Sequence, residues 1–224
     1  MIFVTRFLFP IACVLLLGVS TPLVAQVERQ NDIASEDQTP VLLVVGDSLS
    51  AAYNMPLDAA WPRLLESRLR DAGRPHRVIN ASITGDTTQG GRTRLPRLLE
   101  RHQPAWVIIE LGGNDGLRGF SLDVTRDNLT TMITSSQGAG ARVLLTGILL
   151  PPNYGQGYTE RFEALYGELS DEFGTLLVPF FMDGVALVEG MMQSDGIHPS
   201  EAAQPVLLDN VWRVLEPALS TPAG

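Results

Sequence analysis

The amino-acid sequence predicts a three-layer α/β/α sandwich with a flavodoxin-like, five-stranded parallel sheet in the order 2-1-3-4-5. Short apolar runs alternate with segments of helical periodicity from residue 41 onward. The first run is apolar throughout, as in a parallel strand that is buried on both faces. Strict alternation of strands and helices also implies right-handed crossovers. The strands are expected at residues 41–45, 77–80, 105–109, 142–146 and 176–178.

Five segments between and after these strands carry apolar residues at helical spacing. The first begins near Trp61 and ends at Gly73, and the second closes at residues 102–104, where a proline follows. The apolar positions or bounds that define the five expected helices are Trp61, Leu64, Leu65 and Leu69; Leu95, Leu98 and Leu99; the segment 123–137; Phe162, Leu165, Tyr166, Leu169 and Phe173; and Val206, Leu207, Val211, Val214 and Leu215. In such a sheet, ligands bind beyond the carboxyl ends of the strands.

Length and composition limit the classes of function. The 224 residues suit one domain, and 45% hydrophobic content excludes global disorder. A net charge of −9 without a block of basic residues argues against a nucleic-acid partner. The single cysteine, Cys13, excludes an intramolecular disulfide and a cysteine-based zinc site, and we expect no cofactor.

The first 25 residues are interpreted as a secretory signal peptide. Arg6 precedes an apolar run of signal-peptide length, and Ala25 offers a small residue for cleavage. An uncleaved membrane anchor is the alternative, although the run is short for a span and Pro10 interrupts it. Residues 26–40 are expected to be a polar leader and residues 41–219 the folded domain. We therefore expect a periplasmic or secreted monomer with no stable membrane span after cleavage.

The first candidate for chemistry is a serine directly after the first strand. Gly46 permits a sharp turn that would hold Ser48 at the sheet edge, close to the start of a helical segment. A helix N-terminus favours negative charge and would lower the cost of a developing alkoxide on this hydroxyl. A serine that only caps a helix explains the fragment equally well. A phosphate-binding loop is excluded, because no Gly-Lys-Ser/Thr ending follows Gly46.

Two further loops offer hydrogen-bond donors at the same edge. Gly85, after the second strand, could direct its backbone N–H toward an anion, and an ordinary turn glycine is the alternative. After the third strand, Gly112 and Gly113 precede Asn114, whose side-chain amide could donate to a ligand. Turn formation explains Asn114 equally well, and Asp115 is expected to order the loop rather than to take part in chemistry.

A histidine base can be sought by elimination, because the chain has three histidines. His76 lies at the start of a strand and His102 in the last turn of a helix, whereas His198 alone follows a strand on the reactive side. Asp195 precedes His198 by three residues across an Asp-Gly turn, so it could hold one imidazole nitrogen and leave the other free to accept a proton. A metal site would need further ligands that are missing.

These residues together resemble the four sequence blocks of the SGNH (GDSL-type) hydrolase family. Within that family, the chain is most similar to the bacterial periplasmic branch with thioesterase, lysophospholipase and arylesterase activity. The resemblance implies an SGNH hydrolase fold, a Ser48–His198–Asp195 triad, and an oxyanion hole formed by the Ser48 and Gly85 N–H groups and the Asn114 side chain. One departure is Ala52, where that branch tends to have glycine, and it is expected to stiffen the loop. The blocks that carry the resemblance are Gly46-Asp47-Ser48-Leu49-Ser50, Gly85, Gly113-Asn114-Asp115 and Asp195-Gly196-Ile197-His198-Pro199.

The resemblance implies an exported serine esterase that cleaves small acyl esters, thioesters or lysophospholipids through an acyl-enzyme. The acyl chain is expected to lie along apolar loop residues, although ordinary loop packing explains the same side chains. A carbohydrate O-acetylesterase of the same fold is the alternative enzyme, and a binding module that lost its chemistry is the alternative outside enzymes. The candidate acyl-binding residues are Leu117, Phe120, Leu149, Leu150 and Tyr154.

Overall fold

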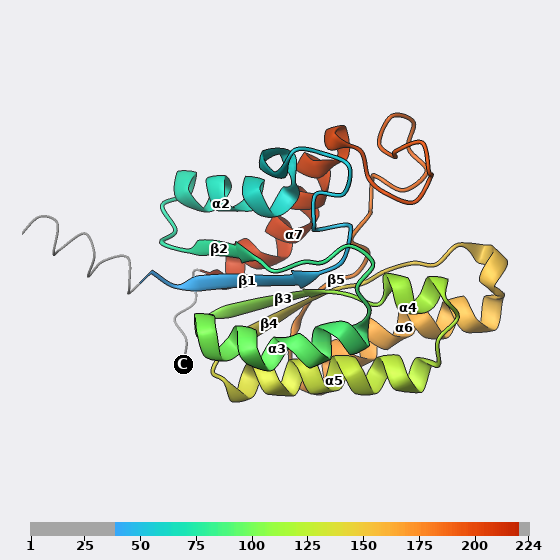
Figure 1. Ribbon diagram of the computed structural model, residues 1–224, viewed down its shortest axis with the longest axis horizontal. Helices are drawn as coiled ribbons and strands as arrows, with labels where there is room; N and C mark the ends of the chain where they lie inside the picture. Colours follow the sequence, from blue (N-terminus) through green and yellow to red (C-terminus); the bar gives the residue numbers. More distant parts are fainter. Residues whose placement is uncertain (1–38, 220–224) are drawn as a thin grey trace, which may run out of the picture. The chain divides into compact units, whose positions relative to one another are not determined.

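The computed structural model describes residues 39–219, so the predicted signal peptide and nearly all of the predicted leader lie outside the described residues. The described chain forms a five-stranded, all-parallel sheet in the order β2-β1-β3-β4-β5, which confirms the predicted architecture (Figure 1). None of the helices within residues 39–219 is long and apolar enough to cross a membrane. The strands are β1 (Val41–Gly46), β2 (Arg77–Asn80), β3 (Trp106–Glu110), β4 (Arg142–Thr146) and β5 (Leu176–Val178).

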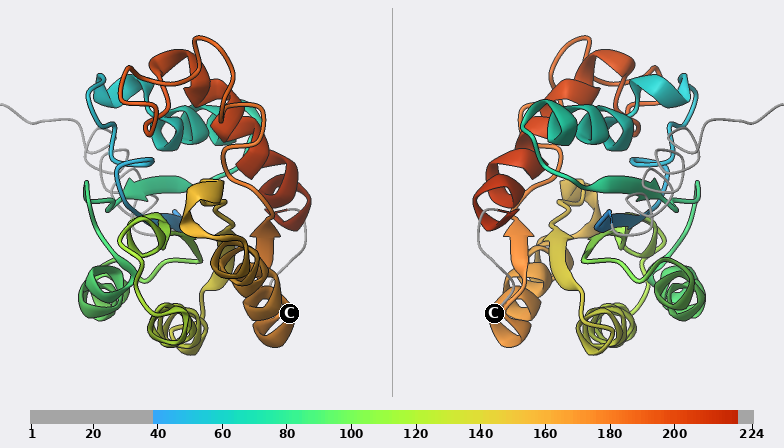
Figure 2. Two further views of the ribbon diagram at one scale, coloured as in Figure 1. Left: turned by 90° about the vertical axis from the view of Figure 1, so that its right-hand side faces the viewer. Right: turned by 90° about the vertical axis from the view of Figure 1, so that its left-hand side faces the viewer.

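The helices cover both faces of the sheet, as strict β–α alternation requires. Two of them, α2 and α7, pack on one face, and α3, α5 and α6 pack on the other, with the short α4 near the carboxyl end of β3 (Figures 1 and 2). Their bounds are α2 (Trp61–Asp71), α3 (Thr88–His102), α4 (Gly113–Leu117), α5 (Leu122–Gly138), α6 (Gln156–Phe173) and α7 (Gln204–Leu219), with 3₁₀ turns at Leu57–Ala59, Pro152–Tyr154 and Glu201–Ala203.

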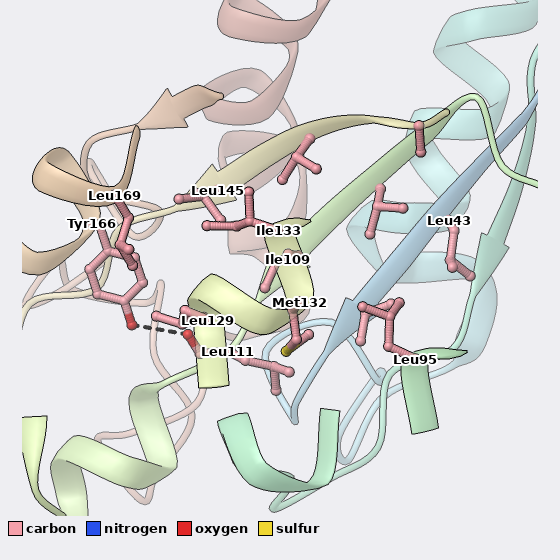
Figure 3. Close-up of a cluster of buried hydrophobic side chains, with 14 of the residues drawn as sticks. Leu43, Leu95, Ile109, Leu111, Leu129, Met132, Ile133, Leu145, Tyr166 and Leu169 are labelled. Atoms are coloured by element: carbon pink, nitrogen blue, oxygen red, sulfur yellow. Dashed lines mark hydrogen bonds between the residues drawn. The ribbon is translucent and has the colours of Figure 1, made fainter. Parts of the chain in front are cut away.

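The central strands are buried on both sides, which explains their continuous apolar sequence. Every residue of β1 and β3 is buried, and side chains alternate along each strand between the two cores. Leu43 and Ile109 contribute to the core shared with α3, α5 and α6 (Figure 3), whereas Leu42 and Ile108 face α2 and α7. Burial of so much apolar surface fixes the register of the strands, and the register sets which loops meet at the carboxyl edge.

The prediction that Ser48 lies close to the start of a helical segment is wrong. The chain there forms a single turn, in which the Ala51 N–H donates to the Asp47 carbonyl at 3.0 Å, and α2 begins only at Trp61. Ala52 and Asn54 adopt left-handed φ values of 59° and 53°, which do not continue a right-handed helix. The Ser48 hydroxyl therefore lies on a tight turn, and a helix macrodipole does not account for its environment.

Candidate active site

The loops after β1 and β5 bring Ser48, His198 and Asp195 into direct contact. His198 Nε2 lies 2.9 Å from Ser48 Oγ, and His198 Nδ1 lies 2.7 Å from Asp195 Oδ2. With the Nδ1 proton directed at the carboxylate, Nε2 faces the hydroxyl as a hydrogen-bond acceptor. A hydroxyl, an imidazole and a carboxylate in this order can deliver a serine oxygen as a nucleophile and store its proton.

Asp195 is solvent-exposed, yet several hydrogen bonds stabilise its charged form. Its Oδ1 accepts from the N–H groups of His198 at 3.0 Å and Ile197 at 2.9 Å, in the turn that Gly196 makes at φ 68°. The bonds from the His198 backbone and imidazole, followed by the Ile197 N–H, lower the pKa of Asp195 to about 2. Asp195 is therefore an ionised acceptor throughout the neutral pH range.

Contacts with the serine loop fix the position of the histidine loop. The Gln193 N–H donates to the His198 carbonyl at 2.7 Å, and Gln193 Nε2 donates to the Tyr53 and Pro199 carbonyls at 3.0 and 2.9 Å. The Tyr53 ring lies against the His198 ring, with centroids 4.1 Å apart. Sequence reasoning missed both Tyr53 and Gln193, because their contacts join segments about 140 residues apart and leave no local pattern.

Three donors predicted from the sequence line the loops beside Ser48. Within residues 39–219, neither the Ser48 N–H nor the Gly85 N–H donates to a protein acceptor. Asn114 Nδ2 donates to Asp47 Oδ2 at 2.9 Å, which fixes the orientation of the amide and leaves its second N–H for another acceptor. Gly112, at φ 117°, lets the chain turn into α4, and a Cβ there would overlap the Tyr166 hydroxyl.

An arginine that the sequence analysis did not single out holds the Gly85 loop against β1. Arg94 Nε pairs with Asp86 at 2.8 Å, its Nη2 donates to the Gly46 carbonyl at 3.3 Å, and its Nη1 donates to the Ala81 carbonyl. The Ile83 N–H also donates to the Gly46 carbonyl at 3.0 Å. These bonds give the loop after β2 a defined position beside the serine turn.

Asp115 has the ordering role expected from the sequence. It is buried and accepts hydrogen bonds from the Thr88 N–H, at 2.9 Å, and from the Thr88 hydroxyl. It therefore joins the loop after β3 to the first turn of α3, and its carboxylate makes no contact with Ser48 or His198.

The other two histidines lie away from this edge. His76 immediately precedes β2 and His102 is the last residue of α3, so both lie near the amino ends of the strands. Burial is the largest cause of the lowered pKa of each, with nearby arginines adding to it. Among the described residues, no group of three His, Cys, Asp or Glu side chains is arranged to hold a metal ion.

The candidate acyl-binding residues lie on two loops that contact each other. The Tyr154 hydroxyl donates to the Leu117 carbonyl at 3.0 Å, and Leu150 packs so closely on Gly116 that a Cβ there would lie 2.5 Å from it. Leu149 and Phe120 are 39% and 42% exposed, so their apolar surface is available to a ligand. Leu117, Leu150 and Tyr154 are partly buried and form the contact between the loops.

Comparison with known proteins identifies the family. Residues 44–205 match the GDSL-like Lipase/Acylhydrolase family. The chain is 55% identical over 178 residues to Esterase TesA of Pseudomonas aeruginosa, covering 80% of this chain and 89% of that protein. It is 49% identical over 179 residues to Thioesterase 1/protease 1/lysophospholipase L1 of Escherichia coli strain K12, covering 80% and 85%. A crystal structure of TesA, at 55% identity, superposes with a TM-score of 0.77 and covers 79% of this chain and 98% of that one. The chain therefore belongs to the GDSL-like lipase/acylhydrolase (SGNH hydrolase) family and is a serine ester hydrolase.

Proposed function

We propose that this protein is an exported esterase that hydrolyses carboxylic esters and thioesters, of the arylesterase, acyl-thioesterase or lysophospholipase type, through an acyl-enzyme on Ser48. The observation that carries the proposal is the continuous hydrogen-bonded series from Ser48 Oγ through His198 to Asp195. His198 Nε2 accepts the hydroxyl proton as Ser48 Oγ forms a bond to the substrate carbonyl carbon. Asp195 stabilises the imidazolium that results.

The tetrahedral intermediate then needs donors for its oxyanion. The Ser48 N–H, the Gly85 N–H and the free N–H of Asn114 supply them, and removing one such donor costs about 10²–10³ in kcat. His198 returns the proton to the leaving alcohol or thiol as the carbonyl–heteroatom bond breaks. Water, deprotonated by His198, attacks the acyl-enzyme and releases the carboxylic acid, which regenerates Ser48.

The distribution of exposed apolar side chains supports a substrate with a hydrocarbon chain. All eight exposed large hydrophobic residues within residues 39–219 lie on connections that follow the carboxyl ends of strands, or on the first turn of the helix that follows. Connections from helix to strand at the opposite edge carry none. Apolar surface at the edge of the sheet that carries Ser48 favours an acyl chain over a carbohydrate. These residues are Leu57, Ile83, Phe120, Val124, Leu149, Leu187, Val188 and Ile197.

Replacement of the serine tests the proposed nucleophile. Ser48→Ala should lower kcat for a p-nitrophenyl ester at least about 10³-fold, because within residues 39–219 no other hydroxyl forms a hydrogen bond with His198 Nε2. Ser194→Ala is the matched control, since Ser194 is exposed on the same loop as His198 and makes no side-chain hydrogen bond in the described structure. A folded Ser48→Ala variant with most of the wild-type activity would contradict the assignment.

The substrate class and the export are tested separately. A panel of acetyl, octanoyl and aryl esters, an acyl thioester and a lysophospholipid should show higher kcat/KM for the longer acyl chains. Substitution of Leu149 by Ala should shift that preference toward shorter chains, and an unchanged profile would count against acyl binding there.

For export, the mature chain isolated from the periplasm or medium should begin near residue 26 by mass spectrometry. Recovery of only the full-length chain from the membrane fraction would support the anchor alternative.

A further inference from the structure

A buried carboxylic side chain contacts the turn that carries Ser48. Glu110 is the last residue of β3, is fully buried and pairs in register with Gly46 at the end of β1. It follows four apolar residues in the strand, and the proposed reaction assigns it no role. A buried acid at the carboxyl edge of a central strand needs a physical explanation, because burying a charge is costly.

Glu110 contacts the residues on both sides of Ser48. Its Oε2 accepts from the Asp47 N–H at 3.2 Å and from the Ser50 hydroxyl at 2.7 Å. The Ser50 hydroxyl in turn accepts from Trp61 Nε1 at 3.1 Å, which ties the network to α2. A Cβ on Gly46 would lie 2.7 Å from Glu110 Oε2, so the close approach of this side chain requires glycine at that position.

The neighbouring Asp47 is also buried, but its hydrogen bonds differ from those of Glu110. Both Asp47 oxygens accept: Oδ1 from the Leu49 N–H at 3.0 Å and Oδ2 from Asn114 Nδ2 at 2.9 Å. This arrangement suits an ionised carboxylate. Glu110 Oε1 has no hydrogen-bond partner, and within residues 39–219 no arginine or histidine nitrogen bonds to Glu110.

Two buried carboxyl groups whose charges interact, as those of Asp47 and Glu110 do, cannot both ionise without a large cost. The charges of His198 and Asp86 act on Asp47, lowering and raising its pKa respectively. Arg94 donates to the Gly46 carbonyl, and the pKa of the buried Tyr166 of α6 is raised by burial and in part by Glu110 and Asp47. Burial and the charge of Asp47 raise the pKa of Glu110 well above its usual value. Burial also raises the pKa of Asp47, to about 6, against the opposing effect of its bonds from Leu49 and Asn114.

We propose that Glu110 is a positioning residue that remains an uncharged carboxylic acid and fixes the turn carrying Ser48, while Asp47 holds the single negative charge of the pair and orients Asn114. Glu110 touches no reacting atom. It acts through the Asp47 N–H and the Ser50 hydroxyl, which bracket the nucleophile, and through Asp47 it reaches the oxyanion donor Asn114. Ionisation of Glu110 would add a second buried negative charge near the developing oxyanion and oppose its formation.

The catalytic part of this inference rests on the proposed function, and three variants test it. Glu110→Gln keeps an uncharged acceptor for the Asp47 N–H and the Ser50 hydroxyl, so kcat for a monomeric p-nitrophenyl ester should stay within about threefold of wild type. Glu110→Leu removes the acceptor, and displacement of the serine turn should lower kcat about 10–100-fold with little change in KM. Glu189→Gln, at an exposed site, is the control for loss of a carboxyl group and should behave as wild type.

The outcomes separate positioning from a purely structural role. A folded Glu110→Leu with wild-type kcat would overturn the proposal, and so would a Glu110→Gln as impaired as Glu110→Leu, since the charge would then be needed. Where Glu110→Leu does not fold, the pH profile decides. Across neutral pH, where Glu110 is an uncharged acid, the kcat profile of Glu110→Gln should run parallel to that of wild type. A wild-type kcat that rises with pH relative to Glu110→Gln, as a carboxyl group needed in its charged form ionises, would overturn the proposal.

The protonation state can be measured without any activity. Infrared difference spectra of wild type minus Glu110→Gln, slightly above neutral pH, should show the carbonyl stretch of a protonated carboxylic acid. The same band should appear when both proteins also carry Ser48→Ala. Its absence would overturn the claim for Glu110 even in an active esterase. Its presence in a chain that hydrolyses no ester would mean that the proposed function, and not the protonation of Glu110, is wrong.

Discussion

Asp47, next to Ser48, and Asp195, three residues before His198, have pKa values that are shifted in opposite directions. Asp195 is exposed, accepts three hydrogen bonds and has a pKa lowered to about 2. Asp47 is buried, accepts two, and has a pKa raised to about 6, mainly by burial. Hydrogen bonds stabilise the charged form in both, but desolvation is the largest cause only for Asp47, where it outweighs the bonds. Solvent access therefore decides the sign of each pKa shift.

Replacement of Asp195 should mainly lower activity, whereas replacement of Asp47 should have a smaller effect on activity and a larger effect on stability. The largest effect on activity is therefore expected from Asp195. Asp195→Asn should lower kcat by about 10³–10⁴, because an amide in this place cannot accept from both the backbone and the Nδ1–H, and the imidazole tautomer is no longer held. The melting temperature at neutral pH should fall only slightly, because Asp195 is exposed and solvent screens its stabilising contribution. Asp183→Asn removes the same charge from an exposed site on the same connection and should keep full activity. Near-normal turnover in Asp195→Asn would mean that the contact with His198 has no catalytic role.

Asp47→Asn should have a smaller effect on activity. One of its two hydrogen bonds must be lost, because the new amide nitrogen would face either the Leu49 N–H or Asn114 Nδ2. We expect kcat to fall about 10–100-fold, less than the roughly 10²–10³-fold expected for Asn114→Ala, which removes the donor itself. If Asp47 acts by orienting Asn114, the double variant should be no worse than Asn114→Ala alone. Multiplication of the two losses would contradict this shared role.

The pH dependence of stability should separate the two aspartates by sign. A raised pKa means that the folded chain binds more protons than the unfolded chain, so Asp47 makes stability fall as pH rises from about 4 to about 6. The free energy of unfolding of Asp47→Asn, relative to wild type, should therefore increase across that window by roughly 1–3 kcal/mol. Denaturant titrations at several pH values measure it, and a flat difference would contradict the pKa of Asp47.

The contribution of Asp195 to stability should change with pH in the opposite direction. Its lowered pKa means that its stabilising contribution is complete above about pH 4 and is lost as pH falls toward about 2. Asp195→Asn should accordingly flatten the acid end of the stability curve and leave the window above about pH 4 unchanged. A change of slope above that value would show that another group is responsible.

The smallest expected effect concerns the backbone of the serine loop. Ala52 adopts φ 59°, a conformation that costs non-glycine residues about 1–2 kcal/mol, whereas glycine adopts it freely. Ala52→Gly should raise the free energy of unfolding by up to about 1 kcal/mol, part of the gain being offset by the greater freedom of the unfolded chain. Catalysis should be nearly unaffected, and a destabilised variant would show that the strain is relieved elsewhere.

Sequence patterns predicted the parts of this molecule that depend on short segments. Buried strands such as Val41–Gly46 are continuous apolar runs, and the sheet order followed from strict alternation. His198 could be chosen by elimination because strand order assigns each loop to an edge of the sheet. The meeting of Ser48, His198 and Asp195 was predictable for the same reason.

Contacts between distant segments were not predictable in this way. The contact between the Tyr53 and His198 rings and the hydrogen bonds of Arg94 depend on three-dimensional placement and leave no periodic signal in the sequence. Glu110 had a faint signal, as a charged residue at the end of an apolar strand. The prediction of a helix near Ser48 was wrong because Gly46 permits several kinds of turn. The left-handed φ values of Ala52 and Asn54 give a tight turn instead of a helix.

The nucleophile is tested most directly by labelling with a fluorophosphonate and locating the adduct by peptide mass spectrometry. We expect a single adduct on Ser48, formed much more slowly in His198→Ala because Oγ then lacks its base, and formed normally in the Ser194→Ala control. An active enzyme that remained unlabelled at Ser48, or carried the adduct on another residue, would contradict it.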